Sequence, residues 1–165
     1  MVMTSEAYEL QVLLELRQGE REQAEALFAE AVGELEKVRR RVREAQGRWE
    51  RVEAQRRQGT QTFDERARQK GMALVELQNI DRYLEGLRQL SDEAQQALTQ
   101  VQEEEQRAQR QVHAAQRAMQ GAISALKAVE GHHEAWRDEQ KTLHRRKAEA
   151  QMDEVATRLW REQQP

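Results

Sequence analysis

Apolar residues recur at alternating steps of four and three along almost the whole chain, and this spacing restricts the fold more than any other feature. It places one apolar stripe along a helix and is typical of a coiled coil. The first seam is interrupted only by two arginines. Its members are Leu10, Leu14, Arg17, Arg21, Ala24, Phe28, Ala31, Leu35, Val38, Val42, Ala45, Trp49 and Val52.

A second seam with the same spacing follows from Ala73 to Leu143. Gly19, Gly33 and Gly47 share one outer heptad position of the first helix, where a missing side chain costs no packing. The two seams predict an all-α fold, a long antiparallel two-helix coiled-coil hairpin with an extra helical segment at the loop end. In that arrangement each helix hides its seam against the other.

The break between the helices is expected in the stretch "RRQGTQTFDE". Gly59 suits the end of one helix, and Thr60 or Thr62 suits the N-cap of the next. Ser91, followed by two acidic residues, is either a second N-cap or a polar position inside a continuous helix. We therefore expect a single coiled-coil domain over 1–165, with a helix at 4–58, a turn at about 59–62, a helical segment at 63–90 and a long helix at 92–160.

Composition favours helix over disorder. Charged residues make up 35% of the chain and aromatic residues 4%, but the dominant residues are good helix formers and the single proline is Pro165. The chain has no cysteine, which excludes disulfides and cysteine metal sites. A net charge of −3 creates no strong field toward nucleic acid. The N-terminal stretch "MVMTSEAYELQVLLEL" carries glutamates among its apolar residues, so we expect a cytosolic chain without direct membrane insertion.

No group of polar residues has the pattern of a reaction centre. His132 and His133 point about 100° apart on a helix and cannot share one metal ion. The run Arg39, Arg40, Arg41 and Arg43 is interleaved with glutamates, which favours ion-paired helix faces over a phosphate-binding stripe. A thin rod also offers no cleft for a substrate. We expect neither an enzyme nor a bound metal or cofactor.

Antiparallel pairing would bring the two ends of the chain together. Both ends carry more large apolar residues than a two-stranded core can hide, so the open end of the hairpin is expected to be a docking surface. The N-terminal cluster consists of Tyr8, Leu10, Leu13, Leu14 and Leu16, and the C-terminal cluster of Met152, Val155, Leu159 and Trp160.

The C-terminal stretch "RRKAEAQMDEVATRLWREQQP" resembles the end of the FliJ/YscO-like stalk proteins of flagellar and type III secretion export machines. The matching residues are Lys147, Glu149, Met152, Asp153, Glu154, Val155, Ala156 and Arg158. The stretches "LLELRQGEREQAEALFAEAVGEL" and "LVELQNIDRYLEGLRQL" resemble the family's first helix and its middle segment.

This resemblance implies a non-enzymatic central stalk, similar to the rotor shaft of rotary ATP synthases. Its paired helix ends would sit in the hexameric type III export ATPase, and the other end would reach the cytoplasmic domain of the export gate protein. Export chaperones are further implied partners, and the implied location is cytoplasmic, peripheral to the inner-membrane export apparatus. The implied ATPase-binding residues are Leu10, Leu13, Leu14, Met152, Asp153, Glu154, Val155, Arg158 and Leu159, and the implied gate-binding residues are Leu77, Ile80 and Leu84.

Two other classes of protein share this composition. A phage-shock-like membrane-associated hairpin would need basic residues on an N-terminal amphipathic helix, and this chain has no Lys or Arg before Arg17. A secreted coiled-coil effector or chaperone-like binder stays open as the other alternative. Liposome co-sedimentation and co-purification with a ring ATPase would separate these classes.

Overall fold

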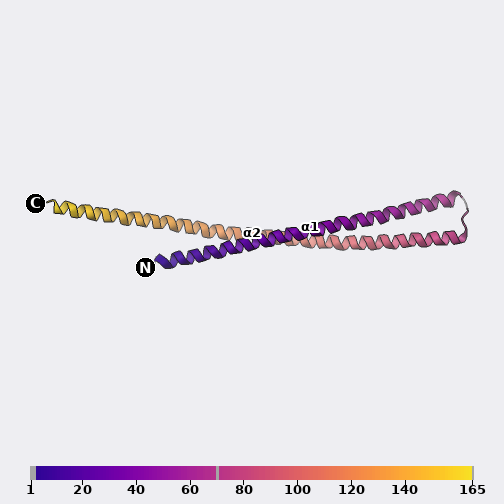
Figure 1. Ribbon diagram of the computed structural model, residues 1–165, viewed down its shortest axis with the longest axis horizontal. Coiled ribbons are helices and arrows are strands. Elements are labelled where there is room, and N and C mark those ends of the chain that lie inside the picture. The colour runs from indigo at the N-terminus through magenta and orange to yellow at the C-terminus, as the bar shows by residue number, and fades with distance from the viewer. Residues whose placement is uncertain (1–2, 70, 165) are drawn as a thin grey trace. The chain divides into compact units, whose positions relative to one another are not determined.

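The protein consists of two long helices joined by a short link. The structure, a computed structural model, describes residues 3–69 and 71–164, with side chains described from Leu10 onward. Helix α1 spans Met3–Gln69 and helix α2 spans Leu74–Glu162, with lengths of 67 and 89 residues. Figure 1 shows the link between them and their opposite directions on either side of it. The described residues contain no strand, so the predicted all-α helical hairpin is confirmed.

The heptad seams form the contact between the helices, as predicted. Every α1 seam residue from Leu10 to Val52 is buried or half-buried, and so is every α2 seam position from Leu77 to Gln140. An added Cβ would meet nothing within 4 Å at Gly19, Gly33 or Gly47, which fits their outer position. The chain has few aromatic residues, so burial of the aliphatic seam residues supplies most of its apolar stabilisation.

The chain divides into two compact units. We call residues 26–116 the loop unit, and residues 3–25 with 117–164 the terminal unit. The loop unit holds most of the buried side chains: Leu35, Leu87, Ala94, Leu98, Ala108 and Ser91. Among the described residues of the terminal unit, Leu126 is the one buried hydrophobic side chain.

Polar contacts across the seam fix the antiparallel register of the loop unit. The Arg39 Nε lies 3.3 Å from the Glu105 Oε1, and the Ser91 Oγ donates a hydrogen bond of 2.7 Å to the Glu53 Oε2. Two heptads separate Arg39 from Glu53, and two heptads separate Glu105 from Ser91 in the opposite direction. A slip of either helix by one heptad would break both contacts.

Ser91 occupies a polar position inside a continuous helix, which is the second of its two predicted interpretations. It is 6% exposed and lies within α2, so the expected start of a new helix at residue 92 is wrong. The Ser91 hydroxyl donates its hydrogen bond to the Glu53 carboxylate, so this buried polar group has a partner without capping a helix end.

The predicted turn at 59–62 is also wrong, because α1 continues through it to Gln69. Gly59 lies on the seam, where an added Cβ would come within 3.2 Å of Leu84 Cδ2. The glycine therefore serves close helix packing. The Thr60 and Thr62 hydroxyls donate back to the carbonyls of Arg56 and Gln58, four residues earlier, as helix-interior threonines do.

The observed link includes the described residues Gly71 to Ala73, which are not helical. The Leu77 N–H donates to the Ala73 carbonyl over 3.1 Å, which starts the hydrogen bonding of α2. No separate helical segment exists at the loop end, since residues 63–69 complete α1 and residues 74–90 begin α2.

Candidate interaction surfaces

The last part of α2, from Leu143 to its end at Glu162, forms a tail that no described residue covers. All described residues from Leu143 to Gln164 are exposed, whereas the half-buried pattern of α2 persists up to Thr142. The large apolar residues of the tail are correspondingly open. Met152 is 72% exposed, Val155 52%, Leu159 54% and Trp160 61%. We call these four residues the tail stripe.

Local interactions hold the tail in a helical conformation. Arg158 donates a hydrogen bond of 2.9 Å to Glu154, one turn earlier, and Arg145 lies 3.9 Å from Glu149 at the same spacing. The Thr157 hydroxyl donates to the Asp153 carbonyl. Such pairs each contribute a few tenths of a kcal/mol, so the tail lacks the strong stabilisation that packing gives the seams.

The tail stripe does not continue the seam. At 100° per residue, its residues point about 90° to 150° away from the midpoint between Gln140 and Leu143, the last pair on the predicted seam. The positions that do continue the seam are polar or small, among them Lys147, Ala150 and Thr157. The stripe is therefore a separate apolar face and not a fraying end of the hairpin core.

The structure does not bring the N-terminal cluster against this stripe. In the terminal unit, covering of α2 ends at Thr142, and Met152 lies about 15 Å farther along the helix axis. The physical reason is length, since α2 has 89 residues and α1 has 67. The predicted pairing of the two end clusters is wrong.

The N-terminal cluster itself is divided between two faces of α1. Leu10 and Leu14 are half-buried seam residues, while Leu13 is 36% exposed and Leu16 55%. The side chain of Tyr8 lies outside the described residues. Of the nine residues implied to bind the ATPase, the six in the tail are fully accessible: Met152, Asp153, Glu154, Val155, Arg158 and Leu159.

At the loop end, the three residues implied to bind the export gate belong to the seam. Leu77, Ile80 and Leu84 are half-buried, and Leu84 packs beside Gly59. The exposed apolar residues of this end are instead Leu74 at 70%, Val75 at 66% and Tyr83 at 60%. Sequence reasoning missed these three, although each is a large apolar or aromatic residue off the heptad period.

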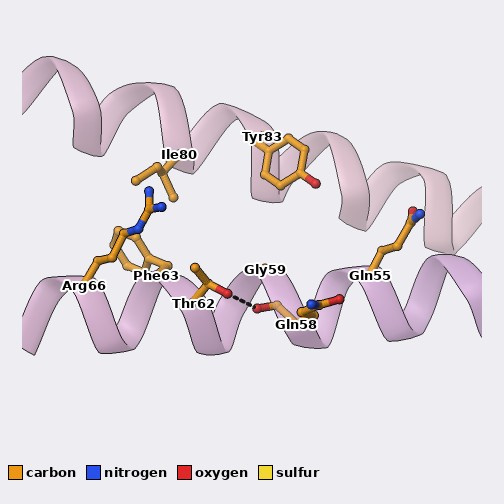
Figure 2. A pocket seen from close by; sticks show the side chains of 8 residues that line it. All are labelled: Gln55, Gln58, Gly59, Thr62, Phe63, Arg66, Ile80 and Tyr83. Atoms are coloured by element: carbon orange, nitrogen blue, oxygen red, sulfur yellow. Dashed lines mark hydrogen bonds between the residues drawn. The ribbon is translucent and has the colours of Figure 1, made fainter.

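A shallow groove of about 380 Å³ lies between the helices near the same end. Figure 2 shows Ile80 of α2 pointing toward Phe63 and Arg66 of α1, with Tyr83 farther along the groove. Gly59 contributes no side chain to the lining and so helps to keep the groove open. Its walls combine the rings of Phe63 and Tyr83 and the side chain of Ile80 with the polar groups of Gln55, Gln58, Thr62 and Arg66, and such a mixed shallow lining suits a side chain of a partner protein better than a reacting substrate.

Some charged residues of the loop unit form ion pairs between the two helices. Arg41 lies 2.7 Å from Glu104 on α2, and Arg39 contacts both Glu105 and Glu36. Arg39 and Arg41 thus pair with the acidic run at 103–105 on α2, and Arg39 also forms the expected ion pair with an interleaved glutamate of its own helix. Exposed pairs of this kind contribute at most about 1 kcal/mol each.

Glu53 is the centre of the most enclosed polar cluster. Its side chain is 14% exposed and accepts hydrogen bonds from Arg56 and from Ser91. The hydrogen bonds from Arg56 and Ser91, with the positive charges of Arg56 and Arg57, lower the pKa of Glu53 to about 2. The bond to Glu53 in turn raises the pKa of Arg56. This carboxylate is therefore held ionised, as a packing element and not as a proton donor.

The histidines do not form a metal site in the part of the chain that the structure describes, where no cluster of three potential ligands occurs. His133 is half-buried on the seam and stacks on Trp136, with the ring centroids 6.1 Å apart. It is thus a polar residue accommodated within the helix contact. Among the described helices, none is both long and apolar enough to cross a membrane.

A family model described as YscO-like protein matches residues 5–165, which is nearly the entire chain. The chain belongs to the YscO-like family. Membership associates it with type III secretion and agrees with the resemblance of its tail. Comparisons with curated proteins and with solved structures gave no significant match.

For this YscO-like protein, each end of α2 carries an exposed apolar surface, in addition to the exposed Val12, Leu13 and Leu16 of α1. One is the tail stripe, and the other consists of Leu74, Val75 and Tyr83 beside the groove. Exposed apolar groups on a helix surface gain free energy when a partner covers them. Both surfaces are therefore suited to binding other proteins.

Proposed function

We propose that this YscO-like protein is the central stalk of a type III export apparatus, in which the tail alone inserts into the hexameric export ATPase. The observation that carries the proposal is the tail stripe, an exposed apolar face on a helix that no other described part of the chain covers. Membership of the YscO-like family supports the choice of a type III secretion apparatus as the assembly in which the protein acts. The paired helix ends of the sequence-based hypothesis are replaced here by a single helix.

A single helix suits insertion into the pore of a ring. It is about 10–12 Å wide with its side chains, narrower than a two-helix coiled coil. The tail from Leu143 to Glu162 reaches about 30 Å along its axis. It also carries the charged Asp153 beside the stripe, which can set the orientation of the docked helix.

The loop end is the second binding surface in this proposal, and its partner is the cytoplasmic domain of the export gate protein. We assign the contact to Leu74, Val75 and Tyr83, because these side chains are exposed whereas Leu77 and Leu84 face α1. Ile80 contributes through the groove. The stalk would work at the cytoplasmic side of the inner-membrane apparatus, without catalytic activity of its own, and export chaperones are further candidate partners.

The test is a double substitution in the tail stripe, Val155→Asp with Leu159→Asp. Placing two carboxylates on the docked face should weaken binding to the export ATPase at least about 100-fold, since each burial of an unpaired charge costs several kcal/mol. Helicity by circular dichroism should barely change, because both residues are exposed in the free protein. Binding is measured by co-purification and by stimulation of ATP hydrolysis.

The matched control places the same charges on the side of the tail that continues the seam, with Ala150→Asp and Thr157→Asp. Both residues are exposed in the free protein, and neither belongs to the stripe. This variant should retain ATPase binding within a few-fold, because its charges stay in water. Unchanged binding of the Val155/Leu159 variant, or equal loss in both variants, would rule out the stripe as the docking face.

A further inference from the structure

The two units differ in how firmly their helices are joined. The loop unit has three polar contacts across the seam, which are Arg39 with Glu105, Arg41 with Glu104 and Ser91 with Glu53. In the terminal unit, all ion pairs and side-chain hydrogen bonds among the described residues lie within a single helix. Apart from apolar contact along its seam, nothing described holds this unit closed.

The terminal unit also buries polar atoms that make no hydrogen bond. Four buried side-chain atoms among the described residues lack a hydrogen bond, and all four lie on the seam of this unit. They are Arg17 Nε, Arg21 Nε, Trp136 Nε1 and Gln140 Oε1. A buried donor or acceptor without a partner loses its hydrogen bonds to water and regains them when the helices part.

The two arginines explain this weakness from the sequence. Arg17 and Arg21 occupy seam positions, but the guanidinium of Arg17 bonds to Glu20 at 2.7 Å and that of Arg21 lies 3.5 Å from Glu25, both on the same helix. Their side chains remain 37% and 38% exposed. At these two consecutive seam positions of α1, only the aliphatic part of each arginine packs against α2. Less apolar surface is therefore buried than with leucine at the same positions.

We propose that the N-terminal segment of α1, residues 10–25, is a releasable strap that separates from α2 while the loop unit stays closed. Release hydrates the four buried polar atoms that make no hydrogen bond and uncovers a face of α2 that includes Leu126, Val129 and Trp136. The strap is a reversible cover on this face. The inference concerns the free protein and does not depend on the ATPase partner.

Hydrogen–deuterium exchange of the full chain, read by mass spectrometry, tests the strap. Amides in residues 10–25 should exchange at least about tenfold faster than those in residues 35–56, because exchange reports the free energy of local opening. Replacing both seam arginines, Arg17→Leu with Arg21→Leu, should slow exchange about tenfold in residues 10–25 and also in 119–136 of α2. The effect on α2 distinguishes release of the strap from fraying of a free helix end.

The matched control makes the same chemical change away from the seam, with Arg40→Leu and Arg43→Leu. Both arginines are exposed on α1, so the exchange of residues 10–25 and 119–136 should not change. Equally slow exchange of residues 10–25 and 35–56 in the unmodified protein would overturn the proposal. So would unaltered exchange in the Arg17/Arg21 variant, while circular dichroism establishes that each variant is folded.

Discussion

Glu53 shows how one ionised side chain can be accommodated between two helices. Its carboxylate receives hydrogen bonds from Arg56 on its own helix and from Ser91 on the other, so both ends of the contact are satisfied. A buried polar contact of this kind disfavours other registers, because any slip would leave the carboxylate and the hydroxyl without partners. The same hydrogen bonds that keep Glu53 ionised therefore also favour the observed register.

The low pKa of Glu53 predicts a stability that depends on pH in the acid range. Its pKa of about 2 in the folded chain lies below the ordinary value of 4.5, so ionised Glu53 stabilises the fold above about pH 4.5. That contribution is lost as pH falls from 4.5 toward 2. Urea unfolding at a series of pH values should therefore show a smaller loss over this interval for Glu53→Gln than for the unmodified chain.

Glu44→Gln is the control for this titration, since it makes the same change at an exposed position of α1. Its dependence on pH should follow that of the unmodified chain between pH 4.5 and 2. The assignment to Glu53 fails if Glu53→Gln and Glu44→Gln lose the same stability over that interval. The stability that Ser91→Ala loses between pH 4.5 and 2 should lie between the losses of these two variants, because Glu53 keeps its stronger hydrogen bond to Arg56.

At the scale of the helices, the heptad period predicted most of the packing, and local turn signals misled. The seam from Leu10 to Val52 can be predicted from α1 alone, because the apolar residues of each helix follow the heptad period whatever the partner helix is. Gly59 misled because a glycine suits both a helix end and a close helix crossing, and the sequence does not distinguish these uses. Continuing the seam by three positions would have included Arg56, Gly59 and Phe63, all half-buried.

Glycine-to-alanine substitutions in α1 should separate helix propensity from packing. Gly33→Ala should stabilise the protein by about 0.5–1 kcal/mol, because the added methyl meets nothing within 4 Å. Gly59→Ala gains the same propensity, but its methyl comes within 3.2 Å of Leu84 Cδ2, so the leucine must shift. Its net gain should be smaller, as measured by urea unfolding. An equal gain at both positions would contradict close packing at Gly59.

At the scale of the whole molecule, few of the described side chains are buried. The chain is 35% charged, and its described core consists of six hydrophobic residues and Ser91. Many half-buried seam residues share the stabilisation, so exposed apolar groups stand out as candidates for binding. The tail stripe could be predicted from the sequence because its apolar residues exceed what a two-stranded core can bury. The sequence could not show that the stripe is unpaired, because that depends on where the link lies and thus on the unequal helix lengths.

The unpaired tail predicts unequal effects of two deletions of the same length. Removing residues 143–165 should shift Tm by less than about 3 °C, because the described side chains of this segment are exposed and make no hydrogen bond or ion pair to α1. Removing residues 1–23 takes away the seam residues Leu10 and Leu14 and uncovers Leu126 and its neighbours on α2. This second deletion should lower Tm more, as followed by circular dichroism at 222 nm. A greater loss from the tail deletion would mean that the tail packs on the hairpin, and the tail stripe would then be part of the core.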